Sequence, residues 1–187
     1  VRQAVPLKDP LTKEVLGYEA LYVGKAELIR GEATEETANG KGGSVSEYVP
    51  ATVDIMSAKE EIRAGDRLLP EPARAFMSYT PHAPNIDVGA RVVSVYGSGA
   101  VVNAAQNQVI AINLGEQDGM QAGDVLSLMT QGARIKDTTD PTRPMVKLPS
   151  ESHGTAIVSR TFERVSYALI LDVLTAVRVG DRLVNPQ

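Results

Sequence analysis

The stretch MQAGDVL at residues 120–126 has two close copies, IRAGDRL at residues 62–68 and VRVGDRL at residues 177–183. The shared pattern is apolar, polar, small apolar, Gly, Asp, any residue, Leu, and the glycines lie 58 and then 57 positions apart. Gly can supply a positive φ at a tight turn, and the Asp carboxylate can accept a backbone hydrogen bond before the Leu enters the core on a new strand. The even spacing predicts repeated turn-and-strand units. The residues with this structural role are Gly65, Asp66, Gly123, Asp124, Gly180 and Asp181.

The alternative role for the three Asp residues is metal binding or acid–base chemistry. That chemistry needs the carboxylates to converge on one site. One carboxylate in each of three separate turns places them far apart, so the structural interpretation is favoured.

The segments between these turns contain short β-branched runs that alternate apolar and polar residues, bounded by Gly, Pro, Asn or Asp. Helical periodicity is weak throughout, so the pattern predicts an all-β chain. We expect strands at Val1–Leu7, Val15–Val23, Lys25–Arg30, Ala51–Ser57, Ala90–Val95, Val109–Asn113, Val125–Met129, Gly154–Phe162, Ser166–Val173 and Arg182–Val184.

The length of 187 residues allows two small β domains or barrels joined by a Pro-rich linker. We expect an N-terminal β domain at residues 1–72, a linker at 73–88 and a second β domain at 89–187. Within the first domain, residues 31–46 are acidic and Gly-rich with few apolar residues, which predicts a mobile surface loop. A second Pro-containing loop, 130–152, is left open as ordered or disordered.

Composition disfavours several classes of function. The net charge of −4 lacks the basic surface that nucleic-acid binding requires, so nucleic acid is not an expected partner. The chain contains no Cys, which excludes disulfides and thiolate chemistry. It also has no apolar run of membrane-spanning length and no heptad or long apolar face, so we expect the isolated chain to be soluble and monomeric. Because it begins at Val1 without an initiator Met or signal-like segment, we expect a longer precursor.

The candidates for catalysis are few, and each has a simpler structural explanation. A Ser or Thr nucleophile needs a base such as His, and the chain has two, His82 in the expected linker and His153 at the entry to a strand. We expect a surface or packing role for His82 and a loop-anchoring hydrogen bond for His153. Gly97-Ser98-Gly99 lacks the preceding Gly of a nucleophile elbow and predicts a hairpin turn.

Two pairs of carboxylates could in principle act together. Glu35 and Glu36 lie in the expected loop at 31–46, and Asp137 and Asp140 lie in the loop at 130–152 among basic residues. A solvated charged surface explains both pairs, and no cofactor or metal site is predicted. We therefore expect a protein without catalytic activity.

Three stretches, in this order, resemble the C-terminal region of bacterial LysM-domain proteins associated with the type IV pilus secretin. They are LKDP at 7–10 with EVLGYE at 14–19, AGDRLLP at 64–70, and RVSYA at 164–168. Within the second half, ARVVSV at 90–95, VIAINLG at 109–115 and DGMQAGDVL at 118–126 are similar to the C-terminal domain of the flagellar T-ring protein.

These resemblances imply a periplasmic adaptor of the cell envelope. The family's signal peptide and N-terminal LysM module, which binds peptidoglycan, are not in this chain. The implied partners are the outer-membrane secretin, through protein–protein contact, and peptidoglycan, through the missing LysM module.

Two other classes of function stay open. A carbohydrate- or peptidoglycan-binding module would need a cleft that groups Tyr18, Tyr22, Tyr79 or Tyr96. An envelope hydrolase would need His153 or a carboxylate pair converging on a pocket.

Overall fold

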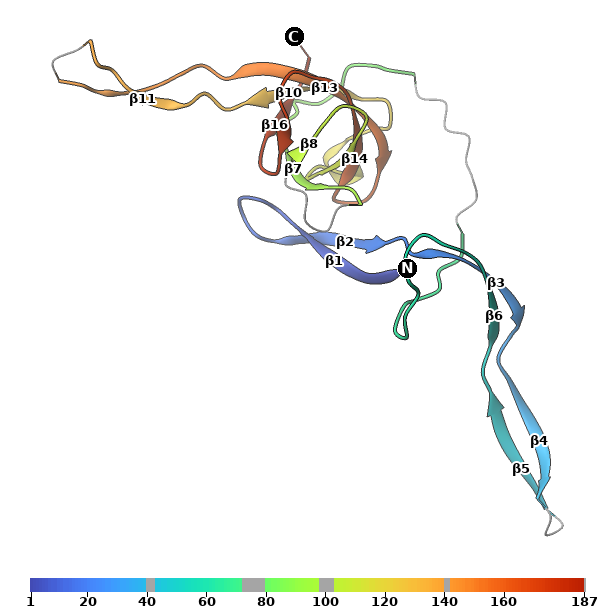
Figure 1. The fold of residues 1–187 in the computed structure, drawn as a ribbon. Coiled ribbons are helices and arrows are strands. Elements are labelled where there is room, and N and C mark those ends of the chain that lie inside the picture. The colour runs from blue at the N-terminus through green and yellow to red at the C-terminus, as the bar shows by residue number, and fades with distance from the viewer. Residues whose placement is uncertain (40–42, 72–79, 98–102, 140–141, 187) are drawn as a thin grey trace. The chain divides into compact units, whose positions relative to one another are not determined.

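The computed structural model describes residues 1–39, 43–71, 80–97, 103–139 and 142–186, shown as a coloured ribbon in Figure 1. The described residues form β-strands and one short 3₁₀ turn, η1 (Glu116–Asp118), which confirms the predicted all-β class. The chain divides into two compact units. The ribbon unit comprises Val1–Val5 and Ala20–Ala73, and the barrel unit comprises Pro6–Glu19 and Arg74–Gln187.

Six strands of the barrel unit close into a barrel in the order β10-β13-β14-β9-β7-β16, and each strand is antiparallel to its neighbours. Closure leaves no free strand edge between these strands. Their bounds are β7 (Ala90–Val95), β9 (Val109–Ile112), β10 (Val125–Thr130), β13 (Glu151–Thr161), β14 (Ser166–Val173) and β16 (Arg182–Val184).

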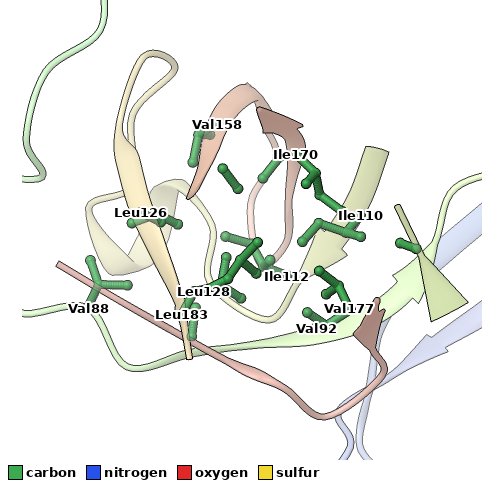
Figure 2. Close-up of a cluster of buried hydrophobic side chains, with 14 of the residues drawn as sticks. Val88, Val92, Ile110, Ile112, Leu126, Leu128, Val158, Ile170, Val177 and Leu183 are labelled. Atoms are coloured by element: carbon green, nitrogen blue, oxygen red, sulfur yellow. The ribbon is translucent and has the colours of Figure 1, made fainter. Parts of the chain in front are cut away.

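The barrel interior is filled by small and branched apolar side chains that alternate along the strands. Leu126 and Leu128 point inward from β10, and Ile110 and Ile112 point inward from β9, all fully buried. Figure 2 shows these side chains converging with those of the facing strands. The two-residue period of the strands explains why the apolar and polar positions alternate in the sequence.

A first hairpin covers the outside of the barrel. It is formed by β1 (Arg2–Lys8) and β2 (Val15–Leu21), and its residues 6–19 belong to the barrel unit. Leu7 packs with Val93, Ala111 and Val165 in a second apolar cluster, with Leu16 against it.

The loop of that hairpin is tied to the barrel by Asp9. One carboxylate oxygen, Oδ1, accepts hydrogen bonds from the backbone N–H groups of Leu11 and Thr12, each at 2.8 Å. The other, Oδ2, accepts a hydrogen bond from the Asn113 side-chain amide at 2.7 Å, and Asn113 Oδ1 accepts the N–H of Arg91. Both carboxylate oxygens of Asp9 therefore hold this loop, one within the loop and one to the barrel.

Two small sheets complete the barrel unit. β8 (Asn103–Ala104) pairs with β15 (Val177–Arg178), and β11 (Arg134–Lys136) pairs with β12 (Met145–Lys147). The β11–β12 hairpin extends from the ends of β10 and β13, away from the barrel (Figure 1). Residues 130–152, left open by the sequence, therefore contain a two-stranded ribbon.

The ribbon unit consists largely of one long hairpin. β3 (Gly24–Arg30) pairs with β6 (Thr52–Ala58), and β4 (Ala33–Asn39) continues beyond β3 to pair with β5 (Gly43–Val49), as Figure 1 shows. The expectation of a mobile loop at 31–46 is wrong for its described residues, because β4 and β5 are paired from Ala33↔Val49 to Asn39↔Gly43. Backbone hydrogen bonds join β4 to β5, and a composition with few apolar residues does not reveal such pairing.

All ten strands expected from the sequence are present, with shifts of at most three residues at their ends. Six further short or polar strands were not predicted: β4, β5, β8, β11, β12 and β15.

The expected linker at 73–88 needs correction where it is described. Residues 73–79 lie outside the described residues, whereas residues 82–88 pack on the barrel. Val88 is buried in the barrel core, and Ile86 packs against it. The N–H of Val88 donates to Asn185 Oδ1, and Asn185 Nδ2 donates to the carbonyl of Ile86, both at 2.7 Å.

Candidate functional site

The three Gly-Asp turns share one geometry. Gly65, Gly123 and Gly180 have φ values of +98°, +104° and +96°, a region that side chains with a Cβ rarely adopt. In each turn the Asp N–H donates to the carbonyl three residues earlier, and the Asp carboxylate accepts the N–H of that same residue. The carboxylate distances are 2.9 Å at Asp66, 2.8 Å at Asp124 and 2.7 Å at Asp181.

Two of these turns dock on a valine of the neighbouring barrel strand in the same way. Gly123 donates its N–H to the carbonyl of Val158, whose own N–H donates to the carbonyl of Asp124, both at 2.8 Å. Gly180 and Asp181 make the same two hydrogen bonds with Val92, at 2.8 and 3.0 Å. Since both valines are fully buried, the turns fix where β10 and β16 enter the core.

The turn at Gly65 differs in its surroundings. The leucines that follow the other two turns, Leu126 and Leu183, are fully buried, whereas Leu68 is 65% exposed. The expectation that this Leu enters a core is therefore wrong for the first copy. Here Arg67 exchanges backbone hydrogen bonds with Val1 instead, each at 2.7 Å.

His82 is held against the second turn rather than lying in a free linker. Its Nδ1 lies 3.1 Å from Oδ1 of the buried Asp124. Its backbone N–H donates to the carbonyl of Gly123, and its carbonyl accepts the N–H of Val125. Pro81 and Pro84 lie near His82 in the sequence and lack a backbone N–H. They do not prevent these two hydrogen bonds, because the N–H and the carbonyl involved belong to His82.

His153 anchors a turn at the end of the barrel, as the hydrogen-bonding role expected from sequence requires. Its Nδ1 lies 3.3 Å from the carbonyl of Thr175 and 3.2 Å from Thr175 Oγ1, and its carbonyl accepts the N–H of Leu174. Within the described chain, Nε2 is buried without a hydrogen-bond partner. When a His acts as the base for a hydroxyl nucleophile, a third group holds its other ring nitrogen. The Thr175 hydroxyl lies at Nδ1 of His153, and the other nitrogen, Nε2, has no such group among the described residues.

Of the two carboxylate pairs considered from the sequence, Glu35 and Glu36 do not form one site. Glu35 and Glu36 are neighbours on β4, so their side chains point to opposite faces of the ribbon. Glu35 instead lies opposite Glu47 on β5. Asp137 accepts hydrogen bonds from the N–H and hydroxyl of Thr139, while Asp140 lies outside the described residues.

Three aromatic rings meet on the outer surface of the barrel. The rings of Tyr96 and Tyr167 make an edge contact with centroids 5.2 Å apart, and Phe162 makes another with Tyr167 at 5.5 Å. The Arg160 guanidinium lies 5.1 Å from the centroid of Phe162. Tyr96 is 49% exposed and Phe162 is 37% exposed, so this aromatic cluster presents ring surface to solvent.

Glu19, from the first hairpin, borders the aromatic cluster. Its carboxylate lies 3.4 Å from the hydroxyls of both Tyr167 and Ser94, and it accepts the N–H of Gly97 at 3.2 Å. Burial, followed by the negative charge of Glu19, raises the pKa of the Tyr167 hydroxyl above its ordinary value of 10. Tyr167 therefore stays protonated and able to donate a hydrogen bond throughout the physiological range.

The tyrosines that the sequence singled out are grouped only in part. Tyr96 belongs to the aromatic cluster, but its partners Phe162 and Tyr167 were not predicted. Tyr18 and Tyr22 are exposed, with no ring contact to Tyr96 among the described residues, and Tyr79 lies outside them. Tyr96 lies in the turn after β7, Phe162 in the turn after β13 and Tyr167 on β14, so no single stretch of sequence contains all three rings.

The ribbon unit exposes most of its apolar side chains. Among its described side chains, Val23 is the apolar residue that is buried. On one face of β3–β6, Leu28 lies opposite Val53 and Ala26 opposite Ile55, and Leu28 is 63% exposed. A two-stranded ribbon without a covering layer is marginally stable in water, so this unit offers a surface suited to a partner.

Other classes of site receive little support. Across the described residues, no three His, Asp or Glu side chains come close enough together to hold a metal ion. In that same part of the chain, no helix has the length and apolar character needed to cross a bilayer. No protein-family model, curated protein or solved structure matches this chain.

Proposed function

We propose that this chain is a non-catalytic adaptor module of the bacterial periplasm that associates with the outer-membrane type IV pilus secretin. In the full-length protein, an N-terminal LysM module would tether it to peptidoglycan. The partner and the location rest on the ordered resemblance of residues 7–19, 64–70 and 164–168 to secretin-associated LysM proteins.

The observation that carries an adaptor role is the exposed ribbon unit. Leu28 and Ile55 project from a hairpin that has no second layer behind it among the described residues. Covering such side chains stabilises an interface by roughly 25 cal/mol for each Å² of apolar surface removed from water. Each strand of a two-stranded sheet also has one unpaired edge, to which a partner strand can add.

The barrel unit differs from the ribbon unit in having a closed sheet around a continuous apolar core. Such a core stabilises a domain by itself, whereas a two-stranded ribbon is marginally stable in water. An adaptor needs this division between a stable body and an exposed binding element.

Co-purification of the full-length precursor with secretin from solubilised envelopes tests the proposal. The LysM-bearing protein should be retained with the secretin, and the double variant Leu28→Ser/Ile55→Ser should lose most of that retention. A matched control, Leu171→Ser/Leu174→Ser, removes two exposed leucines of the barrel unit and should bind as the unchanged protein does. Absence of secretin from the purified material, with the folded protein present, would reject the partner.

The aromatic cluster favours a second candidate, a carbohydrate-binding surface for peptidoglycan glycans. Exposed rings pack against the apolar faces of sugars, and Glu19 and the Tyr167 hydroxyl can hydrogen-bond to sugar hydroxyls. Titration calorimetry with soluble peptidoglycan fragments tests it. Tyr96→Ala should abolish binding, while Tyr18→Ala, which removes an exposed tyrosine outside the cluster, should leave it unchanged. No heat of binding at millimolar fragment would reject this candidate.

A further inference from the structure

The negative charge of the protein is concentrated on one ribbon. Residues 27–54, here called the acidic ribbon, contain six acidic residues and two basic ones, an excess equal to the net charge of −4 of the whole chain. Two of its cross-strand pairs join like charges, Glu35↔Glu47 on β4–β5 and Glu27↔Asp54 on β3–β6. Like charges directly opposite each other destabilise a strand pair.

The β11–β12 hairpin has the opposite charge. Residues 133–148, here called the basic ribbon, contain Arg134, Lys136, Arg143 and Lys147 against two aspartates. Arg134 lies directly opposite Lys147, so this ribbon also has a like-charge pair across its strands. Contact between the two ribbons would offset the repulsion within each of them. The basic side chains of one ribbon would lie near the acidic side chains of the other.

Both ribbons also have exposed apolar side chains and unpaired edges. On the basic ribbon, Ile135 lies opposite Val146, and both side chains are exposed. On the acidic ribbon, Val45 and Tyr48 are exposed on β5. Edge-to-edge pairing of two such ribbons gives a four-stranded sheet, which can cover apolar side chains that neither ribbon covers alone.

We propose that the acidic ribbon of one copy of this chain pairs with the basic ribbon of a second copy. The two ribbons are different surfaces, so the contact is heterologous: the first copy retains an unused basic ribbon, and the second retains an unused acidic ribbon. Repetition of such a contact closes into a ring or extends into a filament. This inference does not require the secretin or a glycan as partner.

The expectation of a monomer came from the absence of heptads and long apolar faces in the sequence. The exposed apolar side chains lie on short ribbons that this criterion does not detect. A charge-driven contact between exposed ribbons is weak and is screened by salt, because the Debye length falls from about 10 Å at 0.1 M to about 3 Å at 1 M. The chain should therefore be monomeric when dilute or at high salt and associate when concentrated at low salt.

Sedimentation velocity of the 187-residue chain tests the proposal, at protein concentrations from about 1 to 200 µM in 20 mM and 500 mM NaCl. We expect association at low salt that weakens at least tenfold at high salt. Glu35→Lys/Glu47→Lys changes the net charge of residues 27–54 from −4 to zero, so that variant has no acidic ribbon. Arg134→Glu/Lys147→Glu changes the net charge of residues 133–148 from +2 to −2, so that variant has no basic ribbon. Each variant alone should remain monomeric, and an equimolar mixture of the two should associate again.

Exposed aspartates outside both ribbons provide the control. Asp87→Lys/Asp172→Lys changes the net charge by the same amount as the acidic-ribbon variant and should associate like the unchanged chain. Monomers at 200 µM in 20 mM NaCl would overturn the proposal, and so would association of either reversed variant alone. A salt-dependent change in sedimentation that is independent of concentration would indicate pairing within one molecule and would also overturn it. Circular dichroism of each variant shows that the strands are retained.

Discussion

Substitution of Gly123 by Ala should destabilise the barrel much more than the same change at Gly180, although the two turns share one sequence pattern. Both glycines have φ near +100°, and an L-residue held there costs on the order of 1 to 2 kcal/mol. Around Gly180 a Cβ would meet no heavy atom within 4 Å, so the cost ends with backbone strain.

At Gly123 the Cβ would lie 2.8 Å from the carbonyl oxygen of Thr80 and 3.0 Å from His82 Nε2. The backbone at residues 80–82 must then move, which weakens the two hydrogen bonds that His82 makes with Gly123 and Val125. Each is worth about 0.5 to 1.5 kcal/mol. The total for Gly123→Ala is therefore about 2 to 4 kcal/mol, against about 1 to 2 kcal/mol for Gly180→Ala.

Urea unfolding followed by circular dichroism measures these differences, since the chain has no Trp to report by fluorescence. Gly89→Ala is the matched control, because Gly89 has an ordinary φ and open space around it. It should be neutral or stabilising by up to about 1 kcal/mol through the unfolded chain. If Gly123→Ala and Gly180→Ala have the same free energy of unfolding, the steric argument for Gly123 is refuted. If both also equal Gly89→Ala, the cost assigned to the positive φ is refuted.

Three further predictions concern hydrogen-bonded side chains. Hydrogen bonds from the Thr12 backbone, Asn113 and Leu11 lower the pKa of Asp9 below its ordinary 3.8, so its ionised form is favoured by folding. The stabilisation of the folded protein by the Asp9 carboxylate should be complete above about pH 5 and be lost as the pH falls below 3.8 through the folded pKa. Asp9→Asn should remove this part of the acid dependence, which urea unfolding measured between pH 2 and 6 would show. Glu19→Gln should lower the pKa of Tyr167, seen as tyrosinate absorbance appearing at lower pH, and an unchanged titration would show that the carboxylate does not act on the phenol. Asp124→Ala should cost more than His82→Ala, by about 1 kcal/mol or more in the free energy of unfolding, because it also removes the acceptor of the part-buried Gln121 N–H hydrogen bond; equal losses would show that the His contact dominates.

The barrel strands that sequence analysis found bury side chains, whereas the missed strands β11 and β12 bury none. Val125–Thr130 and Ser166–Val173 bury alternate side chains in the barrel core, so their burial follows the two-residue period of a strand. The β4 strand, Ala33–Asn39, has solvent on both faces, and its pairing with β5 rests on backbone hydrogen bonds that any sequence can make. Hydrophobic periodicity cannot reveal such a ribbon.

The candidate surfaces were predicted even less completely, for a related reason. Phe162 and Tyr167 lie five residues apart on the β13–β14 hairpin, whereas Tyr96 is more than sixty residues earlier and meets them only because β7, β9 and β14 lie side by side in the barrel. The Asp124 carboxylate was predicted as a turn acceptor from its local pattern. Its contact with His82 was not, since it links the turn to a segment some forty residues earlier.

The barrel order has a consequence for how the protein is made. The strand β16, residues 182–184, is the last barrel strand in the sequence, yet it pairs with the first, β7, through Leu183↔Ala90, and with β10 through Leu128↔Leu183. During synthesis the five earlier strands form an open sheet whose two edges and inner apolar face stay accessible until residue 184 has left the ribosome. Closure must therefore follow translation of this segment, and until then the edges of β7 and β10 lack the strand that separates them from other chains.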